Sequence, residues 1–91
     1  PIQPIFNIKN KTLLVVDSLG VYQVKKLKID YVLLTQSPKM NLERLIDSIK
    51  PNAIIADGSN YKYYILRWET TCLKQKIPFY QTGKPGAFII D

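Results

Sequence analysis

The sequence predicts an α/β fold: a mixed, mostly parallel sheet of five or six short strands with two main helices. Several short runs are apolar at every position, which is typical of strands covered on both faces. Two longer segments repeat their apolar residues every three or four positions, as a helix with one buried side does. The two kinds of segment alternate along the chain, which indicates right-handed crossovers between parallel strands.

The 91 residues suffice for one domain with a single core, and we expect residues 1–91 to form that domain. Its 13 Lys and Arg against 7 Asp and Glu give a net charge of +6, which makes polyanions plausible partners. A single cysteine excludes an intramolecular disulfide. The absence of histidine removes most zinc sites, the usual catalytic triads and the commonest general base.

No stretch of the sequence approaches the roughly 20 apolar residues that span a bilayer, and no signal peptide is visible. The chain begins with Pro1 instead of Met. We therefore expect a soluble domain excised from a longer protein.

The first strands form a predicted β-hairpin, residues 5–8 and 12–17, joined by the polar turn Lys9-Asn10-Lys11. Residues 21–28 fit a short helix or an irregular basic loop equally well. The next strand covers residues 31–34, which are again continuously apolar, and a loop containing Pro38 follows it.

A first helix is predicted at about residues 41–50, with Asn41 as its N-cap. Its apolar positions recur at the spacing of one buried side: Leu42, Leu45, Ile46 and Ile49. Pro51 ends this helix, and residues 53–56 form the following strand.

A second helix is predicted at residues 61–75, after a turn and cap supplied by residues 57–60. Its expected buried stripe is Tyr61, Tyr64, Ile65, Trp68 and Cys72. Residues 77–80 and 87–90 are the last predicted strands, separated by a turn at 83–86. The hairpins at the two ends should add antiparallel edges to the sheet.

Polar residues gather where the predicted strands end, and in such a sheet ligands bind beside the carboxyl ends of the strands. These strand-end rim residues are Asp17, Ser18, Ser37, Asp57, Ser59 and Asn60. The same residue types cap helices and form turns, which explains Asp57, Ser59 and Asn60 without any ligand.

The segment from residue 29 to 57, with "TQSPK" between a strand and a helix, resembles the strand–loop–helix–strand unit of the metallo-β-lactamase fold. Together with the downstream pattern "ADGSN…RW…C…KIPF…GAF", it is similar to the C-terminal part of ComEC-type competence proteins, the membrane channels of bacterial DNA uptake, in their Bacteroidetes-like version. The resemblance spans residues 13–91 and implies a truncated half of the metallo-β-lactamase fold.

Hydrolytic members of the metallo-β-lactamase family carry Thr-His-x-His-x-Asp-His in this loop, whose side chains bind two metal ions. The aligned positions here that should carry the motif are Thr35, Gln36, Pro38, Met40 and Asn41. None of the three histidines is present, and Met40 stands in place of the aspartate. We therefore expect a pseudo-enzyme without metal or cofactor.

Other catalytic patterns are weaker. Ser18 lacks the flanking glycines of a nucleophile elbow. Cys72 has no imidazole partner and fits the core stripe. Magnesium held by Asp17 and Asp57 remains an alternative, because both carboxylates follow strands.

Nucleic-acid contact is the stronger functional hypothesis, because basic and aromatic residues are interleaved along the chain. The candidate contacts are Lys25, Lys26, Lys28, Lys39, Arg44, Lys62 and Tyr63. Tyr63 lies off the predicted buried stripe, so core packing does not explain it. The alternative is a solvated basic surface with most aromatic residues in the core.

Taken with the resemblance, these patterns favour a non-catalytic domain of a ComEC-like DNA-uptake protein, held at the bacterial inner membrane by the transmembrane part of the same polypeptide. Its expected partner is single-stranded DNA bound without sequence preference. The alternatives are a protein-interaction module or homo-oligomer built through an exposed edge strand, and a magnesium-dependent hydrolase or nuclease remnant.

Overall fold

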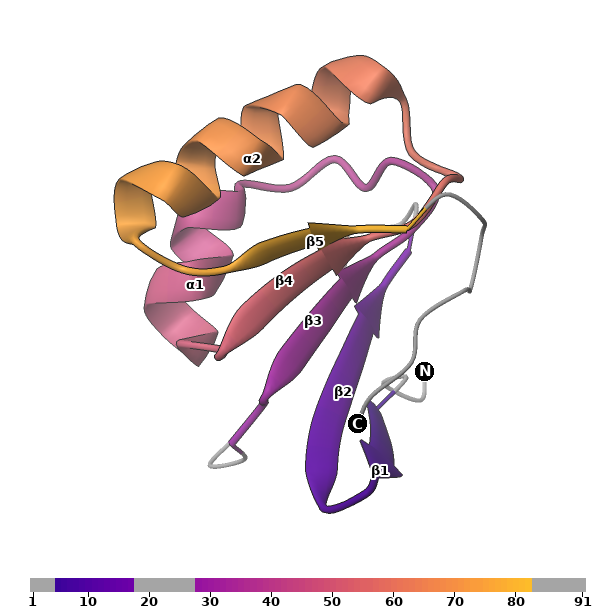
Figure 1. Ribbon diagram of the computed structural model, residues 1–91, viewed down its shortest axis with the longest axis vertical. Coiled ribbons are helices and arrows are strands. Elements are labelled where there is room, and N and C mark those ends of the chain that lie inside the picture. Colours follow the sequence, from indigo (N-terminus) through magenta and orange to yellow (C-terminus); the bar gives the residue numbers. More distant parts are fainter. Residues whose placement is uncertain (1–4, 18–27, 83–91) are drawn as a thin grey trace.

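Five strands and two helices make up the part of the chain that this computed structural model describes, residues 5–17 and 28–82 (Figure 1). In chain order they are β1 (Ile5–Ile8), β2 (Lys11–Val16), β3 (Tyr31–Leu34), α1 (Leu42–Ile49), β4 (Ala53–Ala56), α2 (Lys62–Gln75) and β5 (Phe79–Gln81). The sheet order is β1-β2-β3-β4-β5; β1 is antiparallel to β2 and the other neighbours are parallel. The predicted α/β class, with its mostly parallel mixed sheet, is confirmed.

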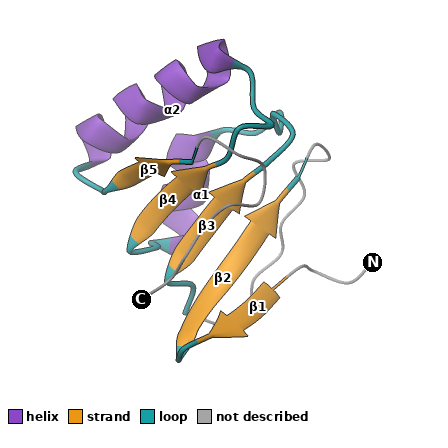
Figure 2. Cartoon of the chain, turned by 45° about the vertical axis from the view of Figure 1, so that its right-hand side comes forward, coloured by secondary structure: helices purple, strands orange, loops and turns teal. Residues whose placement is uncertain are grey.

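Both helices cover the same face of the sheet (Figures 1 and 2). Alternate strand residues point into this main core, among them Leu14, Val32 and Ile54, which are fully buried against Leu45 of α1 and Cys72 of α2. The intervening residues form a smaller cluster on the opposite face: Leu13, Leu33 and Ile55, with Val15 and Tyr31 packed against them. Burial on both faces explains why β3, β4 and residues 13–16 of β2 are apolar at every position.

The β1–β2 hairpin closes through Lys9 and Asn10, whose φ angles are 48° and 63°. Two successive residues with positive φ form the turn type whose twist matches that of paired strands. Ile8 therefore pairs with Lys11, and β2 begins at Lys11 and ends at Val16, one residue earlier at each end than predicted.

Helix α1 forms as predicted. The Asn41 side chain accepts a hydrogen bond from the Arg44 N–H at 3.1 Å, which satisfies one of the free donors of the first turn. Leu42, Leu45 and Ile46 are buried. Lys50 ends the helix with a φ of 53°, and its N–H donates to the Ile46 carbonyl at 2.7 Å.

Helix α2 begins one residue later than predicted, and Tyr61 does not belong to its buried stripe. Tyr61 is 71% exposed, because it precedes the helix in an extended conformation with φ −64° and ψ 141°. Ile65, Trp68 and Cys72 are buried as expected, and Tyr64 is half-buried.

The strand predicted at residues 77–80 begins two residues later, and β5 covers Phe79–Gln81. Lys76 and Ile77 instead cap the carboxyl end of α2. Lys76 has a φ of 59°, and the Ile77 N–H donates to the Cys72 carbonyl at 2.9 Å. Pro78 has no N–H to donate to the sheet, although its carbonyl accepts from the Ile54 N–H at 3.0 Å.

Asp30 connects the amino ends of three neighbouring strands by hydrogen bonds. Its carboxylate accepts hydrogen bonds from the Thr12 N–H at 2.8 Å and from the Asn52 side chain at 3.1 Å. Its carbonyl accepts from the N–H groups of Asn52 and Ala53. This arrangement sets the register of β2, β3 and β4 from the end opposite the rim.

Several predictions lie outside the described residues. They are the greater part of the ambiguous segment 21–28, the turn at 83–86, the strand at 87–90, and the candidate residues Ser18, Lys25 and Lys26.

Candidate functional site

The carboxyl ends of β3 and β4 bring most of the predicted rim residues together. Two loops meet there, one from β3 to α1 and one from β4 to α2. The Ser59 hydroxyl lies 3.1 Å from the Thr35 hydroxyl and accepts from the Gln36 N–H at 2.8 Å. The Ser37 hydroxyl in turn accepts from the Tyr61 N–H at 2.8 Å. Side chains of each loop therefore hold the backbone of the other.

Asn60 lies at the centre of this network and is buried. Its amide nitrogen donates to the carbonyls of Leu34 at 2.7 Å and Asp57 at 2.9 Å, while its amide oxygen accepts from the Ser37 N–H at 2.8 Å. Asn60 is thus not the helix cap that the sequence suggested. Tyr61 occupies the cap position of α2, without a side-chain hydrogen bond to the helix.

The Asp57 carboxylate is also held inside the rim. It is 2% exposed and accepts from both the backbone N–H, at 3.0 Å, and the hydroxyl of Ser59. Asp17 is half-buried just beyond β2, where the neighbouring Thr35 N–H donates to the Val16 carbonyl at 3.0 Å. Within residues 5–17 and 28–82, no three His, Cys, Asp or Glu side chains are grouped so that they could hold a metal ion.

The positions that the resemblance matched to a metal-binding loop have three structural roles. Thr35 and Gln36 belong to the hydrogen-bond network of the rim. Pro38 is fully buried, Met40 packs against the main core, and Asn41 caps α1. This loop thus contributes residues to the rim, to the core and to the cap of α1.

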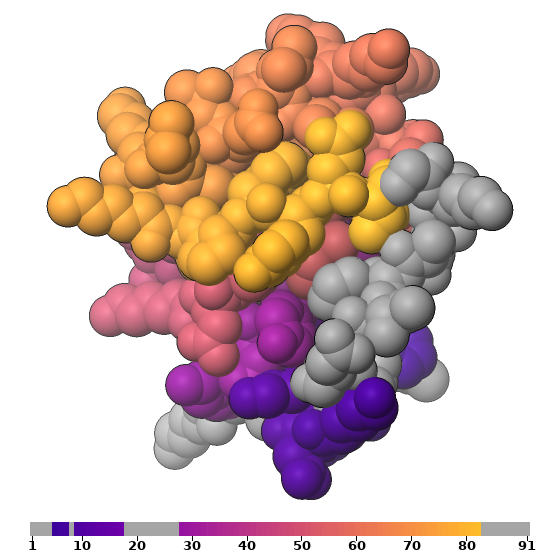
Figure 3. All heavy atoms as spheres, in the orientation of Figure 1, coloured from indigo at the N-terminus to yellow at the C-terminus, as the bar shows by residue number. Residues whose placement is uncertain are grey.

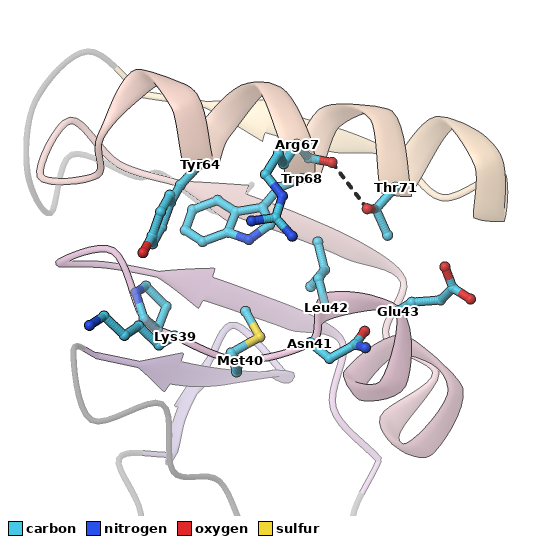
Figure 4. A pocket seen from close by; sticks show the side chains of 10 residues that line it. Lys39, Met40, Asn41, Leu42, Glu43, Tyr64, Arg67, Trp68 and Thr71 are labelled. Atoms are coloured by element: carbon cyan, nitrogen blue, oxygen red, sulfur yellow. Dashed lines mark hydrogen bonds between the residues drawn. The ribbon is translucent and has the colours of Figure 1, made fainter.

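The second half of this loop borders a pocket of about 560 Å³ between the start of α1 and one side of α2 (Figure 4). Its walls are Pro38, Lys39, Met40, Asn41, Leu42, Glu43, Tyr64, Arg67, Trp68 and Thr71. Lys39 and Glu43 lie at opposite ends of the pocket, while Tyr64, Trp68 and Arg67 line it from above (Figure 4). The amino end of α1 also borders this pocket, and such an end favours negative charge.

Arg67 is oriented within this pocket by its neighbour on the same helix. Its Nη1 donates to the Tyr63 hydroxyl at 3.3 Å, and its guanidinium carbon lies 5.7 Å from the centre of the Tyr63 ring. This bond uses one of the five N–H donors of the guanidinium, so the others can reach a ligand. The rings of Tyr64 and Trp68 meet edge to face, with centroids 5.8 Å apart. The pocket is therefore lined by two cationic side chains, Lys39 and Arg67, and by the accessible aromatic ring of Tyr64.

A second hollow, of about 400 Å³, lies at the carboxyl ends of both helices. Lys50 and Lys76 line it and are the C-cap residues of α1 and α2. A helix carboxyl end carries partial negative charge, which these lysines complement. The hollow is therefore less suited to an anion than the pocket bordered by Lys39 and Arg67.

The candidate nucleic-acid contacts are only partly brought together. Lys39 lines the pocket, and Tyr63 contacts Arg67 at its edge and is 60% exposed, as its position off the buried stripe predicted. Lys28, Arg44 and Lys62 are exposed but do not line the pocket. Tyr64, Arg67 and Trp68 belong to the interleaved basic and aromatic residues of the sequence but were not among the selected contacts. Their spacing could have identified them, because residues three and four positions apart lie along one side of a helix. The residues with this spacing are Tyr64, Arg67, Trp68 and Thr71.

The chain is thus a small α/β domain. Its pocket is lined by basic and aromatic side chains and lies beside the hydrogen-bonded loops of the strand-end rim. The family model described as the ComEC C-terminal domain matches residues 1–91, and the chain belongs to this family. It is therefore a domain of a ComEC-like competence protein, a kind of membrane protein. No curated protein and no solved structure matches the chain. Neither described helix is long and apolar enough to cross a membrane.

Proposed function

We propose that this domain is a non-catalytic part of a ComEC-like DNA-uptake protein and contacts single-stranded DNA through the pocket between α1 and α2. The observation that carries the proposal is the meeting of Lys39, Arg67 and Tyr64 in one hollow. Phosphates bind cations, and unpaired bases stack on aromatic planes, so a site of this composition suits a single strand.

The geometry supports binding without sequence preference. Arg67 and Lys39 offer N–H donors that recognise a phosphate whatever base it carries. Tyr64 is half-buried and Trp68 is 5% exposed, so Tyr64 offers the more accessible ring. The Glu43 carboxylate repels phosphate, but it lies at the end of the pocket away from Lys39 (Figure 4). The backbone of the strand would therefore enter at the Lys39 end.

The non-catalytic part of the proposal rests on what the strand-end loops do. In hydrolytic relatives of the metallo-β-lactamase fold, this loop holds the metal ions that activate water. Here the backbone N–H of Gln36 donates to the Ser59 hydroxyl, and the Asn41 side chain accepts from the Arg44 N–H. Pro38 and Met40 pack into the protein. Chelator-sensitive cleavage of a phosphodiester or an amide by the purified domain would overturn this part of the proposal.

DNA binding is tested by fluorescence anisotropy of a labelled oligo-dT with the 91-residue chain, measured in 50 mM and 200 mM NaCl. We expect Lys39→Glu to weaken binding about threefold to tenfold at the lower salt concentration. Removing one phosphate contact should also reduce the slope of log K against log salt by about 0.7.

Lys9→Glu is the matched control, because it makes the same change in net charge at the exposed turn between β1 and β2. A Tyr64→Leu variant tests stacking and should weaken binding without changing the salt slope. The Lys25→Glu/Lys26→Glu pair tests the basic cluster proposed from the sequence. Equal loss in the Lys39 and Lys9 variants would show that net charge alone attracts the DNA and would exclude the pocket.

A protein-interaction role is the second candidate, and the position of β1 favours it. β1 is at the edge of the sheet that residues 5–17 and 28–82 form, and its Phe6 is 51% exposed. Strands at the edge of a sheet can pair with another chain. Sedimentation that shows self-association at rising protein concentration, lost in Phe6→Lys and accompanied by no DNA binding, would favour this role.

In either role, we propose that the transmembrane part of the same polypeptide holds the domain at the bacterial inner membrane. The family assignment supports this proposal. Fractionation of cells that express the whole protein, followed by detection of this domain, would test it. Recovery of the domain in the soluble fraction would contradict it.

A further inference from the structure

The side of α2 that faces away from the sheet carries apolar residues that the core does not use. Leu66 is 62% exposed and Leu73 is 80% exposed. They are seven positions apart and therefore lie almost in line along the helix. Tyr63, 60% exposed, precedes Leu66 by three positions. Ile65, Trp68 and Cys72 bury the opposite side, so packing of the domain does not explain this row.

Thr70 completes the row between the two leucines. Its hydroxyl donates to the Leu66 carbonyl at 3.0 Å, so its polar atom is already hydrogen-bonded within the helix. The methyl group remains as its contribution to the surface. We define the outer row as Tyr63, Leu66, Thr70 and Leu73. In Figure 3, α2 lies across the top of this face of the molecule, beside β5.

Basic residues lie next to the outer row on α2. Lys62, Arg67 and Lys74 are exposed on α2, and Glu69 is the single acidic residue of the helix. Such side chains can extend their aliphatic stems along an apolar surface while the charged groups remain in water. Leucine and tyrosine bordered by lysine and arginine are the composition of a helix that lies on an anionic membrane surface.

The same row fits a partner helix less well. Read as a coiled-coil seam, it would place Tyr63 and Thr70 at the positions where two-stranded coiled coils prefer Ile or Val. Arg67 and Lys74 would then flank the seam, so a second copy of α2 would bring like charges together at one side. A bilayer requires no such matching of side chains, and its anionic headgroups complement the flanking cations.

We propose that the outer row and its flanking cations form a contact surface for a bilayer that contains anionic lipid. Leu66 and Leu73 enter the boundary between headgroups and acyl chains, and Lys62 and Lys74 lie at the phosphate level. The contact is shallow and reversible, because two leucines supply little buried apolar area. The outer row adjoins the pocket through the Tyr63–Arg67 hydrogen bond, but the membrane contact uses neither Lys39 nor bound DNA.

The test is co-sedimentation of the 91-residue chain with vesicles of 30% phosphatidylglycerol and 70% phosphatidylcholine, compared with vesicles of phosphatidylcholine alone. We expect binding to the anionic vesicles to be at least fivefold stronger. Leu66→Ser/Leu73→Ser should weaken it at least fivefold without unfolding the domain, because both side chains are largely exposed. Lys62→Glu/Lys74→Glu should weaken it to a similar extent, and more so at low salt.

Two controls match these variants. Phe6→Ser removes an exposed apolar side chain from β1, at the far edge of the sheet from β5, and Lys28→Glu reverses a charge outside α2. Both should bind vesicles like the unmodified chain, as should Lys39→Glu, which tests the DNA site. Absence of vesicle binding by the unmodified chain would overturn the proposal. Equal weakening by Phe6→Ser, or capture of an acidic amphipathic helix by the outer row in place of vesicles, would also overturn it.

Discussion

Asn60 connects two loops that are distant in sequence, and its effect on stability exceeds that of an ordinary surface amide. Its side chain satisfies the Leu34 and Asp57 carbonyls and the Ser37 N–H. Leaving buried backbone groups without a partner costs about 1–3 kcal/mol each. The rim therefore derives much of its rigidity from one residue.

We expect Asn60→Ala to lower the free energy of unfolding by about 2–4 kcal/mol, since the variant loses the three hydrogen bonds that this side chain makes to the Leu34, Asp57 and Ser37 backbone. Urea unfolding followed by circular dichroism measures this change. Asn52→Ala is the control: Asn52 is exposed and its side chain donates to the Asp30 carboxylate at 3.1 Å. That variant should lose less than about 1 kcal/mol. Similar losses in the two variants would contradict the central role of Asn60.

Cys72 behaves as an apolar core residue. It is fully buried, and desolvation raises the pKa of its thiol from 9.0 to about 12. We expect Ellman's reagent to react with Cys72 at pH 8 only after denaturant is added, because the thiolate is the reactive form. Rapid reaction of the native protein would show that the thiol is accessible.

The raised pKa of Cys72 also predicts the direction of a pH effect. Because the folded-state pKa lies above the unfolded one, the thiol's contribution to stability is complete below pH 9 and is lost as the pH rises towards 12. Other groups titrate in this range, so the comparison with Cys72→Ala isolates the effect. The free energy of unfolding of that variant should fall less steeply above pH 9, in equilibrium unfolding measurements.

At the scale of the elements, the two helices begin differently. Asn41 caps α1 with its side chain, and Glu43 places a negative charge in the first turn. Tyr61 provides no side-chain cap for α2, whose first turn has no acidic residue and begins with Lys62. The start of α2 is therefore less stable than its length suggests, and the Ser37–Tyr61 hydrogen bond helps to hold it.

Tyr61→Asp should raise the free energy of unfolding by about 0.5–1 kcal/mol, because the carboxylate can accept from the first-turn N–H groups and complements the helix dipole. The edge-to-face contact of Tyr61 with Tyr64, at 6.0 Å between centroids, is lost and limits the gain. Thermal unfolding measures the change. Asn41→Ala serves as the opposite control and should destabilise the domain by about 1 kcal/mol. A decrease in Tm for Tyr61→Asp would contradict this account of the α2 start.

At the scale of the whole molecule, the order of the strands explains why the two loops of the strand-end rim lie against each other. Ligand clefts in parallel sheets open where the strand order reverses and the flanking loops diverge. Here β2, β3, β4 and β5 stand in chain order, and α1 and α2 cover one face. The β3–α1 and β4–α2 loops therefore lie side by side and bind each other. The pocket lies instead between the helices, beside Lys39 and Arg67.

The fold could be predicted from the sequence because its signals are local. Asn41 and the apolar spacing of α1 follow from neighbours along the chain, as does the positive-φ turn at Asn10. The predictions were wrong where tertiary contacts, and not neighbouring residues in the sequence, determined the role of a side chain. Asn60 suits a helix cap as well as a buried bridge, and only the approach of Leu34 favours the bridge. The pocket was missed because Lys39 and Arg67 meet only after the helices pack.

The order of the strands also has a consequence for how the molecule is made. As the chain leaves the ribosome, each new strand from β2 to β5 meets its partner at the open border of the growing sheet. Among the strands that the structure describes, none must be inserted between two that are already hydrogen-bonded. Assembly can thus advance in one direction during synthesis, and the border left exposed at each stage is the one that the next segment covers.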